Sequence, residues 1–239
     1  MALFLTNFLL SLTIYCFILN DQVPLAQGAT LGRFYTRIVA SAIACIPLGA
    51  LADNGSMYIQ KGMQSFTQGK IAESINFFDE AELSDNRYSK YLWQRGIAYY
   101  YNNEFSKAKN QFEIDAKVSP SDTEERLWAY LCNAKLITST NEENAIMTRP
   151  LPDRRNYMNV IYEAYQDGKD IVIDPSDNIN RSTEYFYLNL YAGLLEEARR
   201  NPAKSLRYVK DAVNSVYAKA SRDYMVDVAK IHLQLRGNM

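Results

Sequence analysis

The apolar residues of the stretch 91–120 recur at the spacing of two successive amphipathic helices. Those of the first helix share one face, and those of the second follow at four-residue steps: Leu92, Gly96 and Tyr99, then Ala108, Phe112 and Ala116. Gly96 has no side chain, so a neighbouring helix can approach closely there, and Phe112 supplies the bulk that fills the space between the helices. The pattern predicts an antiparallel helical hairpin.

The same pattern occurs once before in the chain. Gly96 follows Gly62 by 34 residues, and Phe112 follows Phe78 by the same interval. Two positions that matter for helix packing therefore repeat together. We interpret this match as evidence for two hairpins stacked in equivalent register.

These positions resemble the tetratricopeptide repeat, whose period is about 34 residues. The resemblance rests on two small residues, two large residues and a closing proline: Gly96 and Ala108, Leu92 and Phe112, and Pro120. The first repeat departs from the family pattern at Ser74, where alanine is usual, and at Asn86, where proline is usual. The resemblance covers residues 57–122 and, more weakly, 183–217. It implies an all-α fold in which antiparallel helical hairpins stack as a short superhelix.

The rest of the chain is predicted to be helical around an irregular middle. We expect the following segments: hairpins at 57–83 and 88–118, an irregular segment at 122–180, a third hairpin at 183–217 and a capping helix at 222–235. Gly193 follows Gly96 by 97 residues, which is not a multiple of 34, so an insertion separates the third hairpin from the first two. The last helix is expected to cover the exposed end of the stack.

Local signals mark several helix ends. Gly69 and Gly168 each end a helix, since glycine readily adopts the conformation that terminates one. Asn201 followed by Pro202 opens another, because proline is well placed at the first helical position. Ser121 begins a capping box that predicts a helix directly after the second hairpin.

Residues 1–52 have the pattern of a targeting leader. Residues 1–19 are almost wholly apolar, and a second apolar run ends in the small residues Ala50 and Ala52. This ending predicts cleavage after Ala52, so that the mature chain starts at Asp53. Two export-like segments in series are similar to the bipartite leaders of thylakoid-lumen proteins of algae and plants, which implies the plastid thylakoid lumen. A secreted protein and a protein anchored in a membrane through the leader are the alternatives.

Composition and residue counts narrow the possible chemistry. The chain has 26 basic and 27 acidic residues and a net charge of −1, so no overall field favours nucleic acid. His232 is the only histidine and Cys132 the only cysteine after the leader, which excludes the usual zinc sites by count. The acidic run 174–178 lacks the central glycine of a calcium loop and is interpreted as a capped turn. We expect no metal and no cofactor.

The candidate catalytic residues have simpler structural interpretations. His232 shares a helical stripe with Met225 and Val228, which favours a packed imidazole, and Cys132 is interpreted as a small buried apolar residue. Three pairs of adjacent glutamates are interpreted as solvated helix faces: Glu124-Glu125, Glu142-Glu143 and Glu196-Glu197. We therefore expect no enzyme, unless Asp and Glu residues distant in sequence converge.

A partner-binding surface is predicted on the side that lines the inner groove in tetratricopeptide proteins. Its residues come from the first helix of each of the first two hairpins: Ile59, Met63, Phe66, Trp93, Ile97, Tyr100 and Tyr101. Apolar and aromatic side chains in a concave site favour another protein's peptide or helix with apolar side chains. Family members that bind the charged tails of chaperones carry lysine and asparagine where Ile59 and Met63 stand, so we reject that role. Alternatively, the last helices fold back over this surface and bury it.

Three hypotheses for the function follow. The first is a non-catalytic tetratricopeptide protein of a plastid lumen, which helps to assemble or hold a thylakoid membrane complex. The second is a secreted α-helical hydrolase that uses distant Asp and Glu residues. The third is a membrane-anchored adaptor that keeps residues 1–52.

Overall fold

A computed structural model of the 239-residue chain describes residues 54–120, 123–137 and 152–237. Every regular element in these ranges is a helix, so the all-α class is confirmed. The chain divides into two units, residues 1–52 and 53–239, and all the described helices belong to the second unit. Among these helices, none is long and apolar enough to cross a membrane. The leader, Ser121 and the pair Glu142-Glu143 lie outside the described residues.

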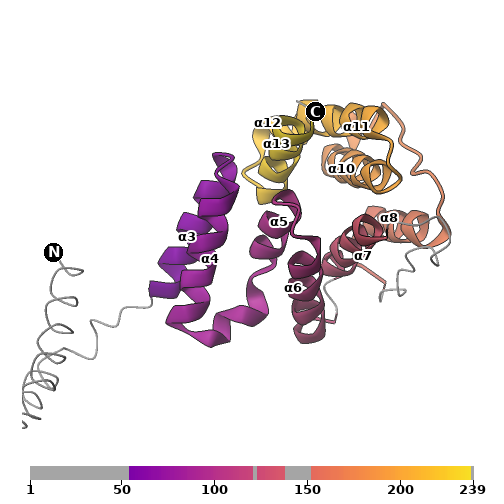
Figure 1. Ribbon diagram of the computed structural model, residues 1–239. Coiled ribbons are helices and arrows are strands. Elements are labelled where there is room, and N and C mark those ends of the chain that lie inside the picture. The colour runs from indigo at the N-terminus through magenta and orange to yellow at the C-terminus, as the bar shows by residue number, and fades with distance from the viewer. Residues whose placement is uncertain (1–53, 121–122, 138–151, 238–239) are drawn as a thin grey trace, which may run out of the picture. The chain divides into compact units, whose positions relative to one another are not determined.

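Adjacent helices pack in pairs, which Figure 1 shows as α3 beside α4, α5 beside α6 and α10 beside α11. The helices follow in this order: α3 (Asn54–Thr67), α4 (Ile71–Ser84), the 3-10 helix η2 (Asn86–Tyr91), α5 (Trp93–Tyr101), α6 (Phe105–Val118), α7 (Glu124–Leu136), α8 (Asn156–Asp167), α9 (Asp177–Asn180), α10 (Ser182–Ala198), α11 (Pro202–Asn214), α12 (Val216–Ala220) and α13 (Tyr224–Arg236). The three pairs overlap the ranges of the three predicted hairpins.

The first two pairs are packed in the same way at a glycine. A Cβ atom on Gly62 of α3 would lie 2.8 Å from the ring of Phe78 in α4. A Cβ atom on Gly96 of α5 would lie 2.7 Å from the ring of Phe112 in α6. Only a residue without a side chain permits this approach. The two glycines, 34 residues apart in the sequence, therefore have equivalent surroundings.

The third pair repeats this packing with a smaller partner residue. A side chain on Gly193 of α10 would meet Val209 of α11 and would lie 3.0 Å from the backbone oxygen of Ser205. Val209 follows Gly193 by 16 residues, the same interval that separates Gly62 from Phe78. Twelve residues after each of the three glycines stands a small buried residue: Ser74, Ala108 and Ser205. One register therefore describes all three pairs.

The helix ends follow local chemistry, with two departures from the sequence pattern. Gly168 has a φ of 67° at the end of α8, as the sequence predicts. The second pair does not begin at residue 88, because the side chain of Asp85 accepts a hydrogen bond from the backbone of Arg87 and starts the short helix η2. The helix predicted to continue to 217 is interrupted at Ser215, whose side chain accepts a hydrogen bond from the backbone of Ala218 and caps α12.

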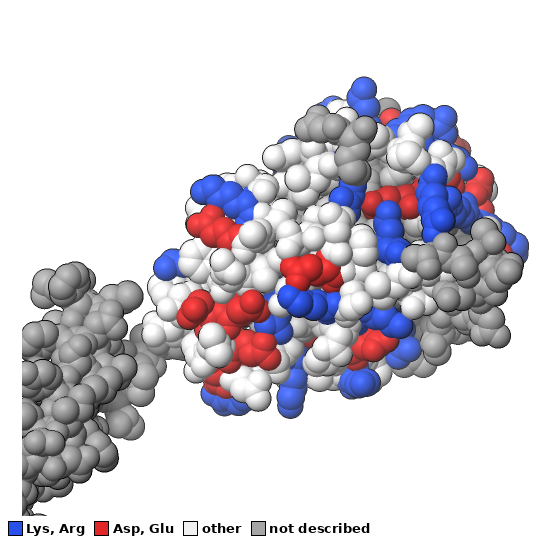
Figure 2. All heavy atoms as spheres, viewed as in Figure 1, with Lys and Arg blue, Asp and Glu red and all other residues white. Residues whose placement is uncertain are grey.

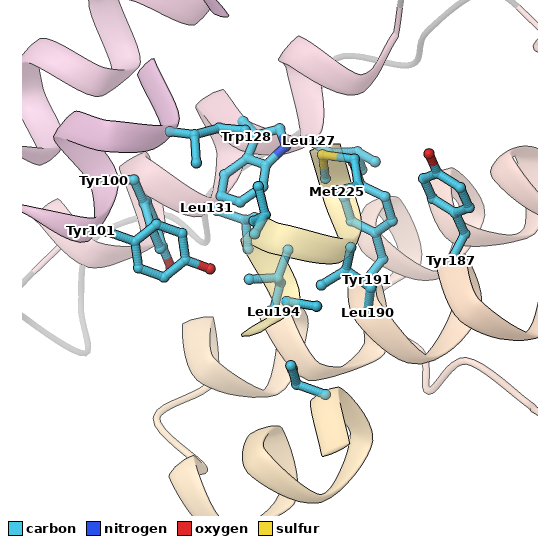
Figure 3. Packing of buried hydrophobic residues seen from close by; sticks show 14 of the residues in the cluster. Tyr100, Tyr101, Leu127, Trp128, Leu131, Tyr187, Leu190, Tyr191, Leu194 and Met225 are labelled. Carbon is cyan, nitrogen blue, oxygen red and sulfur yellow. The ribbon is translucent and has the colours of Figure 1, made fainter. Parts of the chain in front are cut away.

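The core of the fold lies where α5, α7, α10 and α13 meet. Figure 3 shows Tyr100 of α5 beside Trp128 and Leu131 of α7, with Leu194 of α10 and Met225 of α13 on the other side. All five side chains are buried or nearly so. The same cluster of buried residues includes Phe66 of α3, so helices from all three pairs share one apolar core. On the face drawn in Figure 2, by contrast, acidic and basic side chains alternate, so neither sign of charge dominates.

Candidate functional site

The inner face of the fold is built from the first helix of each pair. Counting from Gly62, Gly96 and Gly193, four equivalent positions recur on α3, α5 and α10. They hold three residues each: Ile59, Trp93 and Leu190; Met63, Ile97 and Leu194; Phe66, Tyr100 and Glu197; Thr67, Tyr101 and Ala198. The predicted binding residues are thus the α3 and α5 part of a longer set that continues on α10.

The structure places the seven predicted binding residues in two environments. Phe66, Ile97 and Tyr100 are 0 % exposed and Tyr101 is 4 % exposed, so these four belong to the core. The other three are only partly buried and pack against the edge of the core: Ile59, Met63 and Trp93. In this conformation only the second group can touch a partner. That the seven residues bind a partner remains a prediction.

The C-terminal helix α13 covers the buried part of this inner face. The ring of Tyr224 lies 5.6 Å from the rings of both Phe66 and Trp93. The ring of Tyr101 lies 6.0 Å, edge to face, from the imidazole of His232. This packing corresponds to the alternative in which the last helices fold over the groove. Helix α13 contacts α11 of the last pair and α3 of the first pair, so it connects these two pairs.

A buried carboxylate joins α13 to three other helices. Glu197 of α10 accepts hydrogen bonds from Tyr100 of α5 at 2.7 Å and from Arg236 of α13 at 2.9 Å. Lys135 of α7 lies 3.0 Å from the same carboxylate. Burial raises the pKa of Glu197, but the positive charges of Lys135 and Arg236, and of His232 when it is protonated, outweigh burial and hold that pKa below its usual value.

The burial of Glu196 and Glu197 corrects the interpretation of this pair as a solvated face. Glu197 is 7 % exposed, and Glu196 forms ion pairs with Arg199 and Lys204. The reason is that α10 is buried on all sides from residue 186 to 197, so its last turn also lies inside the fold. The sequence does contain a signal for this: the register counted from Gly193 puts Glu197 where Tyr100 stands in the second pair.

His232 is a packed imidazole, as its position on an apolar stripe predicts. It is 0 % exposed, and its Nδ1 and Nε2 atoms each lie 3.2 Å from a hydroxyl, that of Tyr101 and that of Ser205. Burial lowers the pKa of His232 to about 4. The imidazole is therefore neutral near neutral pH, when one ring nitrogen donates a hydrogen bond and the other accepts one.

Ser205, His232 and Glu197 follow one another in space in the order of a catalytic triad. The distance from His232 Nδ1 to the Glu197 carboxylate is 3.9 Å, however, which is too long for a hydrogen bond. Ser205 is 1 % exposed and occupies the small-residue position that Ser74 and Ala108 occupy in the other pairs. Helix packing thus requires a small residue at this position in every pair. The arrangement binds helices together and offers a substrate no access.

Acidic residues do come together at two places, once within α4 and once from two separate segments, but each group is paired with an arginine. Arg95 of α5 forms ion pairs with Asp79 and Glu82 of α4. Arg155 forms ion pairs with Asp153 and with Glu124 of α7, and the latter also accepts a hydrogen bond from Tyr191. A carboxylate held by a guanidinium is stabilised in its charged form and is a poor general acid. These clusters therefore connect helices.

The described part of the chain contains neither a group of side chains suited to bind a metal ion nor a reactive thiol. Within residues 54–120, 123–137 and 152–237, no three His, Cys, Asp or Glu side chains are grouped so that they could hold a metal ion. Cys132 is buried, and burial raises the pKa of its thiol well above the usual value, so the reactive thiolate is disfavoured. The prediction of a small buried apolar residue is confirmed.

The class of protein that these features define is an all-helical protein of paired helices, whose inner face holds its own C-terminal helix. No protein-family model matches the chain. A search of curated proteins gives no significant match.

Proposed function

We propose that this chain is a non-catalytic scaffold of the tetratricopeptide type that binds a helix or peptide with apolar side chains on its inner face. The observation that carries the proposal is the packing of Tyr224 of α13 against the rings of Phe66 and Trp93. An amphipathic helix lying in an aromatic groove is a common mode of peptide recognition. The inner face is therefore chemically suited to hold a helix from another protein.

The repeat register supports the tetratricopeptide assignment. The Gly62 and Phe78 contact and the Gly96 and Phe112 contact are equivalent, and their 34-residue separation matches the family's period. The first pair also shows why its departure from the family pattern is tolerated. The hydroxyl of Ser74 donates a 2.8 Å hydrogen bond to the backbone oxygen of Gly62, which satisfies a polar group at a position where alanine is usual.

We further propose that the protein acts in the plastid thylakoid lumen, in the assembly or stabilisation of a membrane complex. The support is the two apolar export-like segments in series and the small residues that end at Ala52. N-terminal sequencing of the protein purified from its source tests this. A start at Asp53 supports export and cleavage, whereas a start at Met1 supports the membrane-anchored adaptor.

Partner capture from native membranes, with mass spectrometry of the captured proteins, tests the scaffold proposal. The variants Met63→Glu and Trp93→Ala alter partly exposed inner-face residues and should abolish capture of the specific partner. Gln64→Glu adds the same charge at the neighbouring exposed position of α3 and should leave capture unchanged. Circular dichroism must show equal helicity in all the variants. Equal capture by the folded variants would contradict the proposal.

Substitution of Tyr100 does not serve this test. Its ring is fully buried and its hydroxyl is bonded to Glu197, so removal of the ring would disturb the core as well as any binding.

A hydrolase is the second candidate, favoured only by the contact of Ser205 with His232. A fluorophosphonate probe, which labels activated serines, discriminates between the two. On the scaffold proposal the folded protein is not labelled, and Ser205→Ala changes stability alone. Labelling of the wild-type protein that disappears in Ser205→Ala would establish the hydrolase.

A further inference from the structure

Helix α13 is held on the inner face by three groups along one side. Tyr224 contacts the aromatic pair Phe66 and Trp93. His232, eight residues later, contacts Tyr101, and Arg236, twelve residues after Tyr224, donates a hydrogen bond to Glu197. At about 100° per residue these three positions fall within a sector of about 120°, the width of one face of an amphipathic helix.

Two of these three groups fit their sites incompletely. The hydroxyl of Tyr224 and the Nη2 atom of Arg236 are buried, and neither has a hydrogen-bond partner among the described residues. Leaving a buried polar atom without a partner is unfavourable, because the atom has lost its water. The inner face thus holds α13 with less than the full set of interactions that its side chains can make.

The start of α13 is anchored differently, outside the inner face. Asp223 caps the helix by accepting a 2.9 Å hydrogen bond from the backbone of Met225. Its carboxylate also accepts hydrogen bonds from Tyr187 at 2.6 Å and from Tyr217 at 2.8 Å. The three residues 221–223 connect α12 to α13 without helical structure. Loss of the Asp223 contacts would therefore weaken the attachment of α13 at its start and leave the packing within the three helix pairs unchanged.

We propose that α13 occupies the binding surface of the partner, and that the partner is an amphipathic helix with a cationic residue near its C-terminal end, which displaces α13. This inference rests on the proposed scaffold function. The partner helix presents an aromatic residue to Phe66 and Trp93 and, about three turns later, an arginine or lysine to Glu197. The carboxylate of Glu197 selects for a cation at that end, since an acidic residue there would be repelled in a buried site.

Self-occupancy sets the apparent affinity for the partner. For a ligand that binds only the open state, the apparent affinity equals the intrinsic affinity multiplied by the fraction of time that the surface is open. Variants that release α13 should therefore bind the partner helix more tightly, whereas substitutions on the outer side of α13 should have no effect.

The experiment uses a fluorescent peptide of residues 222–237 as the probe and fluorescence anisotropy with the full chain. Asp223→Ala, which removes the cap and the acceptor of two tyrosines, should raise the affinity about tenfold over wild type. Arg236→Gln, a milder change that leaves Lys135 paired with Glu197, should raise it in the same direction. Lys230→Ala, at an exposed position of α13, is the matched control and should bind as wild type does. A peptide that carries Tyr224→Ala and Arg236→Ala should not bind.

Hydrogen exchange on the same variants completes the test. The α13 amides should exchange faster in Asp223→Ala and in Arg236→Gln, with the other helices protected as in wild type. If α13 opens in either variant and peptide affinity does not rise, the displacement inference is overturned. Equal capture of the native partner by wild type and by the opened variants also overturns it and leaves the scaffold function standing. Absence of any Trp93-dependent capture removes the scaffold function itself.

Discussion

Tyr100 donates a 2.7 Å hydrogen bond to Glu197, although 97 residues separate them and the two occupy the same position of their respective helix pairs. This bond ties the second pair to the third through the buried centre of the fold. We expect Tyr100→Phe to lower the free energy of unfolding by about 2 kcal/mol, because the bond is made to a charged group. Urea denaturation measures the change.

A double-mutant cycle separates this bond from other effects of the substitutions. Glu197→Gln alone should be more destabilising, because it leaves the partly buried ammonium of Lys135 and guanidinium of Arg236 without their counter-charge. The stability lost in the double variant should be smaller than the sum of the losses in the two single variants, by an interaction energy of about 1 kcal/mol. Strict additivity would show that the bond does not stabilise the folded protein.

The glycine contacts predict a ranked set of stability changes. Gly96→Ala should destabilise by about 1 to 3 kcal/mol, because the new methyl group meets the buried ring of Phe112. Gly193→Ala should be more destabilising, since the methyl group there also lies 3.0 Å from the backbone oxygen of Ser205, which cannot move away as a side chain can. Phe112→Leu should restore part of the loss in Gly96→Ala and none in Gly193→Ala. Thermal unfolding of the three single variants and the two double variants tests the ranking, and an unaffected Gly193→Ala would refute the shared register.

His232 predicts a loss of stability in acid. Its pKa is lowered by burial from 6.5 to about 4, so between these values the unfolded chain binds a proton that the folded protein does not. The free energy of unfolding therefore falls as the pH decreases from about 7 to about 4, by up to about 3 kcal/mol from this residue. His232→Gln should show a shallower fall in urea denaturation across this range. Parallel curves for the two proteins would contradict the assignment of a neutral, buried imidazole.

Asp115 predicts the opposite dependence. Burial raises the pKa of its carboxyl from 3.8 to about 7, and the hydrogen bond from Gln111 and the charge of Arg95 only partly oppose burial. The folded protein thus holds a proton that the unfolded chain releases, and stability from this residue is lost as the pH rises from about 4 to about 7. Asp115→Asn should therefore stabilise the protein at about pH 8, by roughly 2 kcal/mol, and have little effect near pH 4.

The site of Asp115 supplies a control for this prediction. The equivalent positions of the other two pairs hold Ala81 and Ala212, so the fold does not need a carboxylate there. Asp79→Asn removes a carboxylate that is partly exposed and paired with Arg95, and it should destabilise rather than stabilise. Similar pH profiles for wild type and Asp115→Asn would show that Asp115 is charged in the folded state.

Local residue patterns determined the helices and how each pair packs. The spacing of Gly62 from Phe78 and of Gly96 from Phe112 is enough to predict close approach, because each contact lies within its own hairpin and depends only on residue size. The apolar helical stripes on which His232 and Cys132 lie were likewise enough to predict their burial. The binding role of the inner face remains a prediction.

Only the tertiary structure decided what covers the inner face and where charge is buried. Helix α13 could have covered the end of the stack; its contacts with Phe66, Trp93 and Tyr101 depend on residues more than 120 positions away. From the sequence alone, a glutamate such as Glu197 is expected at the surface. Its charge is stable inside the fold because Tyr100, Lys135 and Arg236 contact it from three other helices. A buried charge is favourable only when such partners assemble around it, and that assembly is a property of the whole fold.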